Sequence, residues 1–373
     1  GNFITEEKVI RNSLLIDEGD AYNKILWNKS VNEIKSRNIF DNVTSKVKSG
    51  TSEKNKILEV EVEEKPTGEI SAGAGTGTSG SSLSFGLREN NYLGKGIKIN
   101  TALVLSDTSI TGRFEVNNPN YNNSDRSLNT RFETSETDLM TKYGYKSNKT
   151  GFSLGTSYEQ FQNIYFSPNI STYYESLKTS SNASASKKKQ EGDYFDTEFS
   201  YGLTLNKLNQ NFQPSDGYRS SFSQTLPIYT EDLAIENSYQ FSKYHQLKDD
   251  MVFSFNFLAK AVNSISSEDV RVTKRVFLPG RKLRGFEVGK IGPQDGGDYI
   301  GGNYGSAINL ATTLPQLFPD LQEIDFSLFL DAANVWGVDY NSSLDKSSIR
   351  SSTGIAVDWF TPIGPLSFSF AQP

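Results

Sequence analysis

The sequence contains no cysteine and a single histidine, His245, among its 373 residues. Disulfide bonds and thiol chemistry are therefore excluded, as are zinc sites built from cysteine and histidine. A catalytic triad needs a histidine between a nucleophile and a carboxylate, and no such arrangement accompanies His245. We therefore expect no enzymatic activity, no metal site and no cofactor.

Long hydrophobic runs are also missing, which excludes transmembrane helices because these need about eighteen or more consecutive apolar residues. A membrane-spanning β-barrel is not excluded, since each of its strands needs only about ten residues of alternating character. Only 35% of the residues are hydrophobic although 12% are aromatic, so a simple apolar interior does not account for the aromatic side chains. The net charge of -6 argues against nucleic acid as a main partner.

Residues 1–66 differ in pattern from the rest of the chain. Apolar residues at helical spacing predict two helices, the second of which carries Trp27, Val31 and Ile34 on one side. Two strands follow, and in the second Leu58, Val60 and Val62 alternate with glutamates. The order helix, helix, strand, strand predicts a small α/β module in which helices cover one face of a short sheet. A generic α+β domain has the same pattern.

From residue 67 onward, apolar and polar residues alternate along one predicted strand after another. Between Met251 and Ala261, for example, Phe253, Phe255 and Phe257 share one face while polar residues occupy the other. Short turns alternate with long connections such as 163–192 and 263–303, which is typical of an outer-membrane barrel. A soluble β-sandwich or propeller also alternates, but the number of strands and the aromatic content favour the barrel. About fifteen strands are predicted, at 68–78, 81–90, 96–108, 110–117, 127–138, 140–147, 150–162, 193–207, 217–228, 233–244, 251–262, 304–314, 323–336, 348–360 and 365–371.

One connection, Val276–Gly302, has a composition that an ordinary surface loop does not need. Between positions 271 and 284 lie six basic residues, and the segment Leu283-Arg284-Gly285-Phe286 puts a forked cation beside a glycine and an aromatic ring. Arginine makes bidentate contacts that lysine cannot make, and glycine adopts backbone conformations closed to other residues. We predict a loop tip that is inserted into another part of the protein and anchored by Arg284. By contrast, Lys187, Lys188 and Lys189 lie in a Ser/Asn/Ala-rich stretch that predicts a solvated loop.

Several motifs in a fixed order carry a resemblance that covers essentially the whole chain. They are the glycine-rich segment from Pro66 to Gly96, NNPNY at Asn117, PSDGYR at Pro214, LRGF at Leu283, the following IGP and GGN, and DAANVWG at Asp331. In this order they resemble the BamA family of outer-membrane protein assembly factors, within the superfamily of insertases that join POTRA domains to a β-barrel.

The resemblance implies a periplasmic POTRA-like domain at 1–66, without its first strand, and an outer-membrane β-barrel at 67–373. The family barrel has sixteen antiparallel strands, so the closing strand is expected to be missing. Because no signal peptide opens the sequence and the sequence begins and ends abruptly, we expect this chain to be part of a longer protein, truncated at both ends.

The resemblance also implies two sites. The first is a loop tip of Arg284, Gly285 and Phe286 that docks on the inner wall of the barrel, where the strand alternation places Asp331 on the polar face. The second is a lateral seam at the first barrel strand, where Gly73, Gly75 and Gly77 share one face. Glycine weakens a strand, so the seam could open for an incoming strand; a bend in a small barrel is the alternative.

The function implied by the resemblance is the folding and insertion of β-barrel proteins into the bacterial outer membrane. The implied partners are unfolded outer-membrane proteins, lipoproteins of the assembly complex and membrane lipid. A TamA-type assembly protein and a two-partner secretion translocator have the same barrel and loop, and a passive porin is the alternative from another class.

Overall fold

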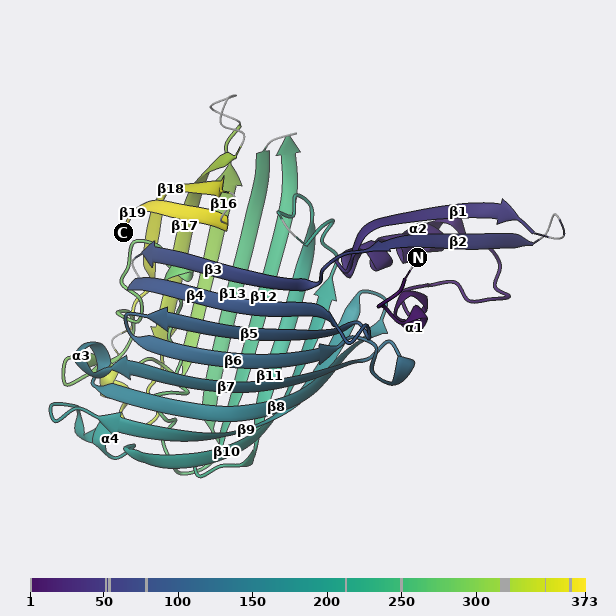
Figure 1. The fold of residues 1–373 in the computed structure, drawn as a ribbon. Helices are drawn as coiled ribbons and strands as arrows, with labels where there is room; N and C mark the ends of the chain where they lie inside the picture. Colours follow the sequence, from purple (N-terminus) through teal and green to yellow (C-terminus); the bar gives the residue numbers. More distant parts are fainter. Residues whose placement is uncertain are drawn as a thin grey trace.

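The computed structural model describes residues 2–50, 52, 55–77, 80–211, 213–248, 251–315, 323–345, 347–361 and 364–373. A small module of helices and two strands lies beside one end of a large curved sheet (Figure 1). Thr78, the last residue of the predicted first barrel strand, falls outside the described residues.

The N-terminal module consists of α1 (Glu7–Arg11), α2 (Lys24–Ser36), β1 (Phe40–Ser49) and β2 (Lys56–Glu64), with β1 and β2 paired antiparallel. Helix α2 begins after Asn23, whose side chain accepts hydrogen bonds from the backbone N–H groups of Ile25 (2.9 Å) and Leu26 (3.2 Å). Its buried face, which includes Trp27 and Ile34, packs against Val62 and other strand residues to form the module core. Within the described part of the chain, no helix has the length and apolar character to cross a bilayer. The identification of this module as a POTRA domain stays a prediction.

The carboxylate of Glu64 holds the segment before α1 against the end of β2. It accepts hydrogen bonds from the backbone N–H groups of Phe3 (2.8 Å), Ile4 (3.0 Å) and Thr5 (2.6 Å). Burial alone would raise the pKa of Glu64, but these bonds, which favour the charged form, lower it to about 2.

Replacing Glu64 with glutamine is therefore expected to lower the stability of the module by about 1 kcal/mol, since the group is partly solvated. Because the folded-state pKa is depressed, this contribution is fully present above the unfolded pKa of about 4.3 and disappears as the pH falls toward 2. Thermal unfolding of the wild type and the variant between pH 7 and pH 2 tests this. The difference should be largest at neutral pH and vanish in acid, whereas a constant difference would contradict it.

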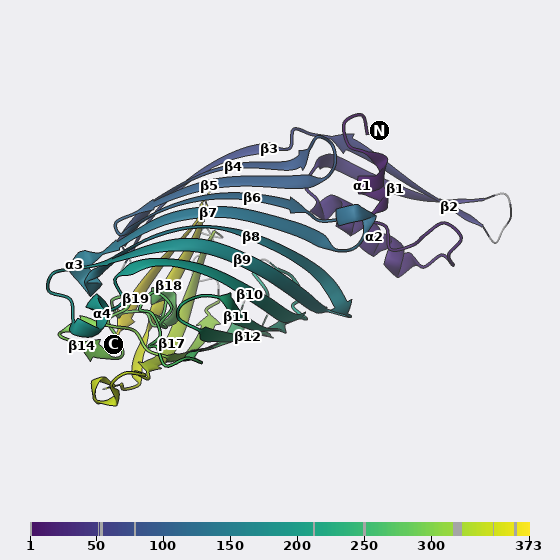
Figure 2. The same cartoon turned by 90° about the horizontal axis from the view of Figure 1, so that it is seen from below.

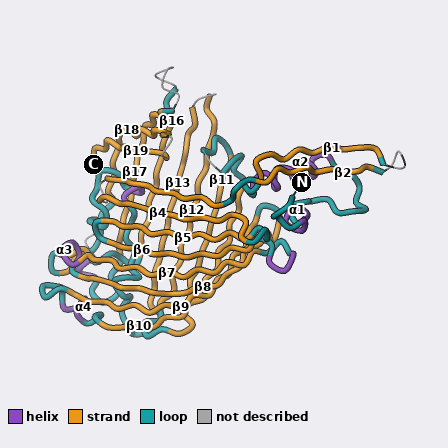
Figure 3. Tube along the Cα trace, viewed as in Figure 1, coloured by secondary structure: helices purple, strands orange, loops and turns teal. Residues whose placement is uncertain are grey.

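Fifteen strands form one antiparallel sheet that curls around an interior, which we call the lumen (Figures 1 and 2). The sheet accounts for most of the chain (Figure 3). Each strand pairs with its neighbours in sequence, and β3 and β19 are the two edges. The strands are β3 (Gly68–Gly77), β4 (Gly80–Tyr92), β5 (Ile97–Ser106), β6 (Ser109–Asn118), β7 (Ser127–Leu139), β8 (Tyr145–Phe161), β9 (Ile164–Thr179), β10 (Gly192–Asn206), β11 (Gly217–Tyr229), β12 (Ala234–Lys248), β13 (Met251–Ser264), β16 (Tyr304–Thr313), β17 (Ile324–Trp336), β18 (Arg350–Thr361) and β19 (Gly364–Gln372).

The two faces of the sheet differ as the alternation predicts. Leu328 and Leu330 of β17 are each 48% exposed on the outer face, whereas the intervening Phe329 and the next inward residue, Asp331, are buried. The same outward exposure of apolar side chains occurs at Leu83, Phe85 and Leu87 of β4. Exposed apolar side chains on the outer face of a curved sheet with a polar interior fit contact with lipid. The transmembrane antiparallel barrel expected from the sequence is thus confirmed as the fold.

The prediction divided one strand into two and missed another strand, so the predicted number of about fifteen strands still agrees with the observed number. The segments 140–147 and 150–162 belong largely to one strand, β8, which the short helix α3 (Met140–Tyr143) precedes. Strand β9 lies where a long loop was predicted. Polar residues on the outward face of β8 near Asn148 interrupt the apolar pattern. In β9, Pro168 interrupts the pattern, and proline is rare inside paired strands because it lacks an N–H donor.

Candidate functional site

The connection between β13 and β16, residues 265–303, lies inside the lumen, and we call it the lumen loop. It contains a 3-10 turn, η2 (Gly280–Lys282), and a two-residue hairpin of β14 (Gln294–Asp295) and β15 (Asp298–Tyr299). Surface connections rarely bury large side chains. Here the buried set comprises Val270, Arg271, Val272, Lys274, Arg275, Val276, Leu278, Leu283, Ile291 and Ile300.

The tip of the lumen loop is bound to the inner wall through Asp331 of β17. Arg284 donates to this carboxylate from Nε (2.7 Å) and Nη2 (2.6 Å), and its backbone N–H donates as well (3.0 Å). Asn309 of β16 donates a further hydrogen bond to Asp331 (2.8 Å) and one to the carbonyl of Lys282 (3.0 Å). The Arg284 guanidinium also lies 3.5 Å from the ring centre of Phe329. Asp331 is completely buried, so this is a bidentate, charge-assisted contact shielded from water.

The other two residues of the predicted tip, Gly285 and Phe286, have different surroundings. Gly285 has a φ of +86°, and a methyl group there would lie 2.8 Å from Cβ of Ala371 in β19. Any other residue would therefore be strained and would also collide with the edge strand. Phe286 packs against an apolar cluster that includes Leu258, Leu283 and Val335. The tip thus contacts β16, β17 and the edge strand β19.

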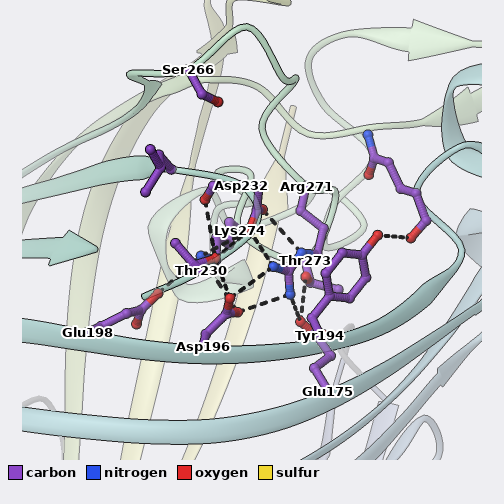
Figure 4. Close-up of polar contacts among 12 residues, drawn as sticks. Glu175, Tyr194, Asp196, Glu198, Thr230, Asp232, Ser266, Arg271, Thr273 and Lys274 are labelled. Atoms are coloured by element: carbon purple, nitrogen blue, oxygen red, sulfur yellow. Dashed lines mark hydrogen bonds and ion pairs between the residues drawn. The ribbon is translucent and has the colours of Figure 1, made fainter. Parts of the chain in front are cut away.

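A second group of charged residues binds the base of the loop to the opposite wall (Figure 4). Arg271, which is 1% exposed, donates to Glu175 of β9 (2.7 Å) and to Asp232 of the β11–β12 turn (3.1 Å from Nε). Its Nη1 lies 3.1 Å from Asp196 of β10, and its guanidinium carbon lies 3.6 Å from the ring centre of Tyr194. One arginine therefore holds three carboxylates from three parts of the wall.

Lys274, one helical turn further along the loop, completes this base network. Its Nζ lies 3.1 Å from Glu198, 3.6 Å from Asp232 and 3.7 Å from Asp196. Burial acts to lower the pKa of both Lys274 and Arg271, but the surrounding carboxylates outweigh burial and raise both pKa values above their ordinary ranges. Both cations therefore stay charged at any physiological pH.

Two further contacts extend from the loop to neighbouring connections. Arg275 pairs with Asp339 and donates to Asn303 (3.2 Å). Lys187, in the short helix α4 (Ala185–Lys188), is 2% exposed at its side chain and lies 3.0 Å from Asp298. The prediction of a solvated lysine loop was therefore wrong for Lys187, because the partner carboxylate is 111 residues away in sequence.

The predicted seam lies at the first barrel strand, an edge of the sheet. Gly73 and Gly75 of β3 face serines of β4, and a methyl group at Gly73 would lie 2.7 Å from the Ser84 hydroxyl. Gly77 pairs with Gly80 at the end of the strand. Between the edges β3 and β19 is a cleft of about 800 Å³, lined by residues that include Gly75 and Ser367. The backbone groups on the cleft side of β3 are unpaired within the described sheet.

The structure thus brings Arg284 and Asp331 together and places Gly73, Gly75 and Gly77 at an edge. Sequence reasoning missed the base network. One feature of the sequence that could have indicated this network is the spacing of Arg271 and Lys274, which lie three positions apart within the basic segment. The inward positions of Asp196 and Glu198 on β10 were another, but Glu175 could not be placed without β9.

Comparisons with known proteins agree on one family. The Omp85 superfamily domain matches residues 91–373. The chain is similar to outer membrane protein assembly factor BamA of Neorickettsia risticii, with 26% identity over 396 residues that cover 100% of this chain and 51% of the relative. It is also similar to the human sorting and assembly machinery component 50 homolog, with 29% identity over 178 residues, 45% of this chain and 37% of the relative. The chain spans about half the length of the BamA relatives it matches.

Solved structures show the same fold. BamA from Haemophilus ducreyi lacking POTRA domains 1-3 matches with a TM-score of 0.82 at 21% identity, over 99% of this chain and 79% of that chain. CdiB from Acinetobacter baumannii matches with a TM-score of 0.60 at 12% identity, over 96% and 66%.

Proposed function

This chain belongs to the Omp85 superfamily, and we propose that the protein containing it folds β-barrel proteins and inserts them into the outer membrane of a Gram-negative bacterium. Its substrates would be unfolded outer-membrane proteins, and assembly lipoproteins would bind the N-terminal module on the periplasmic side. The relatives named as assembly factors support this proposal. We propose further that the protein uses neither a cofactor nor covalent catalysis.

The observation that carries the proposal is the small-residue strand β3, an edge of the described sheet that borders the cleft. An edge strand presents a row of N–H and C=O groups that an incoming strand can pair with by β-augmentation. In β3 the small glycine and alanine side chains leave this backbone accessible, and Ile70 on its outer face is 87% exposed. A substrate strand that entered the cleft would exchange water for strand hydrogen bonds next to lipid, where unpaired backbone groups are most unfavourable.

The lumen loop would hold the wall in a shape that keeps this cleft available. Its base is bound to β9 and β10 through Arg271, and its tip is bound to β17 through Arg284. Since the tip also contacts β19 at Ala371, the loop connects the edge strand to the far wall. A barrel that must open at one edge needs such a fixed connection elsewhere, because its strands otherwise share only nearest-neighbour contacts.

Cross-linking the two edges tests the proposal. With one cysteine at Gly75 of β3 and one at the facing position of the last barrel strand of the full-length protein, oxidation is expected to stop insertion of a barrel substrate, and reduction to restore it. The measurement is the heat-modifiable mobility of the substrate in membranes or proteoliposomes. The matched control joins Ala356 and Ser369, which already face each other in the β18–β19 ladder and need not separate. Normal insertion by a protein fully cross-linked between β3 and its last strand would refute the proposal.

A further inference from the structure

A pocket of about 240 Å³ lies where the N-terminal module meets the barrel. Four parts of the chain line it: helix α1, the end of α2, the β4–β5 turn and the β6–β7 turn. Its charged lining residues are Lys8, Arg37 and Lys95, and no carboxylate is among them. The pocket therefore carries positive charge between the N-terminal module and the barrel.

Arg37, at the end of α2, is the central group of this pocket. Its Nε donates to the Ser13 hydroxyl (2.5 Å) and its Nη2 to the side-chain carbonyl of Asn120 in the β6–β7 turn (2.6 Å). Both partners are neutral, and no carboxylate among the described residues lies within ion-pair distance. Burial lowers the pKa of Arg37, and the attraction of the more distant Glu33 carboxylate offsets this effect only in part. Every buried arginine of the lumen loop, by contrast, has a carboxylate partner.

The neighbouring cations add to this imbalance. Lys95 extends from the β4–β5 turn and makes no described ion pair; the Glu6 carboxylate pairs with Lys8 at 2.6 Å and also interacts electrostatically with Lys95, so one carboxylate faces two lysines. Lys98, just inside β5, interacts electrostatically with Arg37 and adds a further positive charge. A half-buried guanidinium with lysines around an open pocket is the arrangement that binds a phosphate group, since arginine and lysine donors form charge-assisted hydrogen bonds to its oxygens.

The exposed side chains beside the pocket indicate which kind of molecule would carry this phosphate group. Tyr92, the last residue of β4, is 45% exposed, Leu93 of the β4–β5 turn is 67% exposed, and Tyr121 of the β6–β7 turn is 50% exposed. Exposed tyrosine and leucine next to basic residues are typical of a surface at the level of lipid headgroups. Inorganic phosphate has no apolar part that would contact these side chains, whereas the acyl chains of a bound phospholipid would pack beside them.

We propose that this pocket binds the phosphate group of a phospholipid headgroup in the membrane leaflet next to the N-terminal module. Because the module supplies Arg37 and the barrel supplies Lys95, a bound lipid would link the two and fix the module relative to the membrane. This goes beyond the insertion of substrates at the β3–β19 cleft. Binding of a phosphate group by this pocket does not depend on the proposed insertion function. The assignment of that phosphate to a phospholipid does depend on the proposed location of the barrel in a membrane.

Native mass spectrometry of the full-length protein in neutral, phosphate-free detergent tests the proposal. The probes are phosphatidylglycerol, a diacylglycerol with the same acyl chains, and inorganic phosphate as a competitor. We expect the protein to retain phosphatidylglycerol but not diacylglycerol, and inorganic phosphate to displace it. Arg37→Gln and Lys95→Gln should each weaken retention about tenfold, the effect of losing one charge-assisted hydrogen bond. Lys35→Gln, an exposed change on the same helix that does not line the pocket, should leave it unchanged.

The outcomes separate the possibilities. Equal retention of phosphatidylglycerol by the wild type, Arg37→Gln and Lys95→Gln overturns the proposal. Binding of inorganic phosphate that depends on Arg37, without retention of phosphatidylglycerol, overturns the lipid source. Lys95→Gln guards against misfolding as an explanation, since Lys95 is exposed in a turn. Substrate insertion measured on the same variants shows whether the cleft still works when the lipid site is lost.

Discussion

Replacing Asp331 with asparagine is expected to release the tip of the lumen loop from the wall. Asp331 is fully buried and accepts three hydrogen bonds from Arg284 and one from Asn309. An amide of the same shape keeps one acceptor oxygen but removes the charge and turns the second oxygen into a donor that faces the guanidinium. Breaking one side of a buried ion pair destabilises by about 3–5 kcal/mol. Since Arg284 is 20% exposed at its side chain, we expect the lower part of that range.

Limited proteolysis of residues 278–290 and insertion of a barrel substrate measure this effect. Faster cleavage and loss of most of the insertion activity are expected together. The matched control is Asp325→Asn on the same strand, which faces Asp358 across the ladder and has no described cation as a partner. This control should be neutral or slightly stabilising, because it removes repulsion between two carboxylates. A protected loop in Asp331→Asn would contradict the docking role.

Replacing Arg271 with leucine is expected to be still more damaging. The side chain is 1% exposed and neutralises Glu175, Asp196 and Asp232, which come within 3.5 Å of its nitrogens. Without it, Lys274 alone faces Asp196, Asp232 and Glu198, and Glu175 loses its described ion-pair partner. Leaving buried carboxylates uncompensated costs about 3–5 kcal/mol or more. We expect the thermal unfolding temperature of the barrel to fall sharply and the loop to leave the β9–β10 wall.

This variant should also become sensitive to pH in a definite direction. The crowded carboxylates of the folded variant bind protons more readily than those of the unfolded chain, so the folded state gains stability as the pH falls. Unfolding of Arg271→Leu followed between pH 8 and pH 5 should show partial recovery toward acid, and the wild type should show no such trend. Arg281→Leu, an exposed arginine of the same loop, is the control and should behave like the wild type. Equal stability of both variants at pH 8 would exclude a role for the base network.

The sequence allowed the barrel and its faces to be predicted because alternation is a local property that each strand repeats. Strand β9 escaped this reasoning, since Pro168 and a run of polar residues hide the alternation. The contact between Arg284 and Asp331 could be anticipated because the register of β17 places the carboxylate inward and the resemblance places the loop opposite it. The base network could not be predicted, because Arg271, Glu175 and Asp232 meet only through the curvature of the whole sheet.

The lumen loop also has a consequence for the order in which this chain folds. Apart from β13 and β16, which the lumen loop separates, paired strands follow each other along the chain with short connections, so most of the sheet can grow by short loop closures. The loop contacts are different: Arg271 reaches Glu175 across 96 residues, and Arg284 reaches Asp331 across 47. Neither contact can form before the strands on both sides have curled into place, since closing such long segments early is entropically unfavourable. Loop docking is therefore a late event, and until it occurs the lumen contains four carboxylates, Glu175, Asp196, Glu198 and Asp232, that have water and hydroxyl groups of the wall as partners but no cation from the loop.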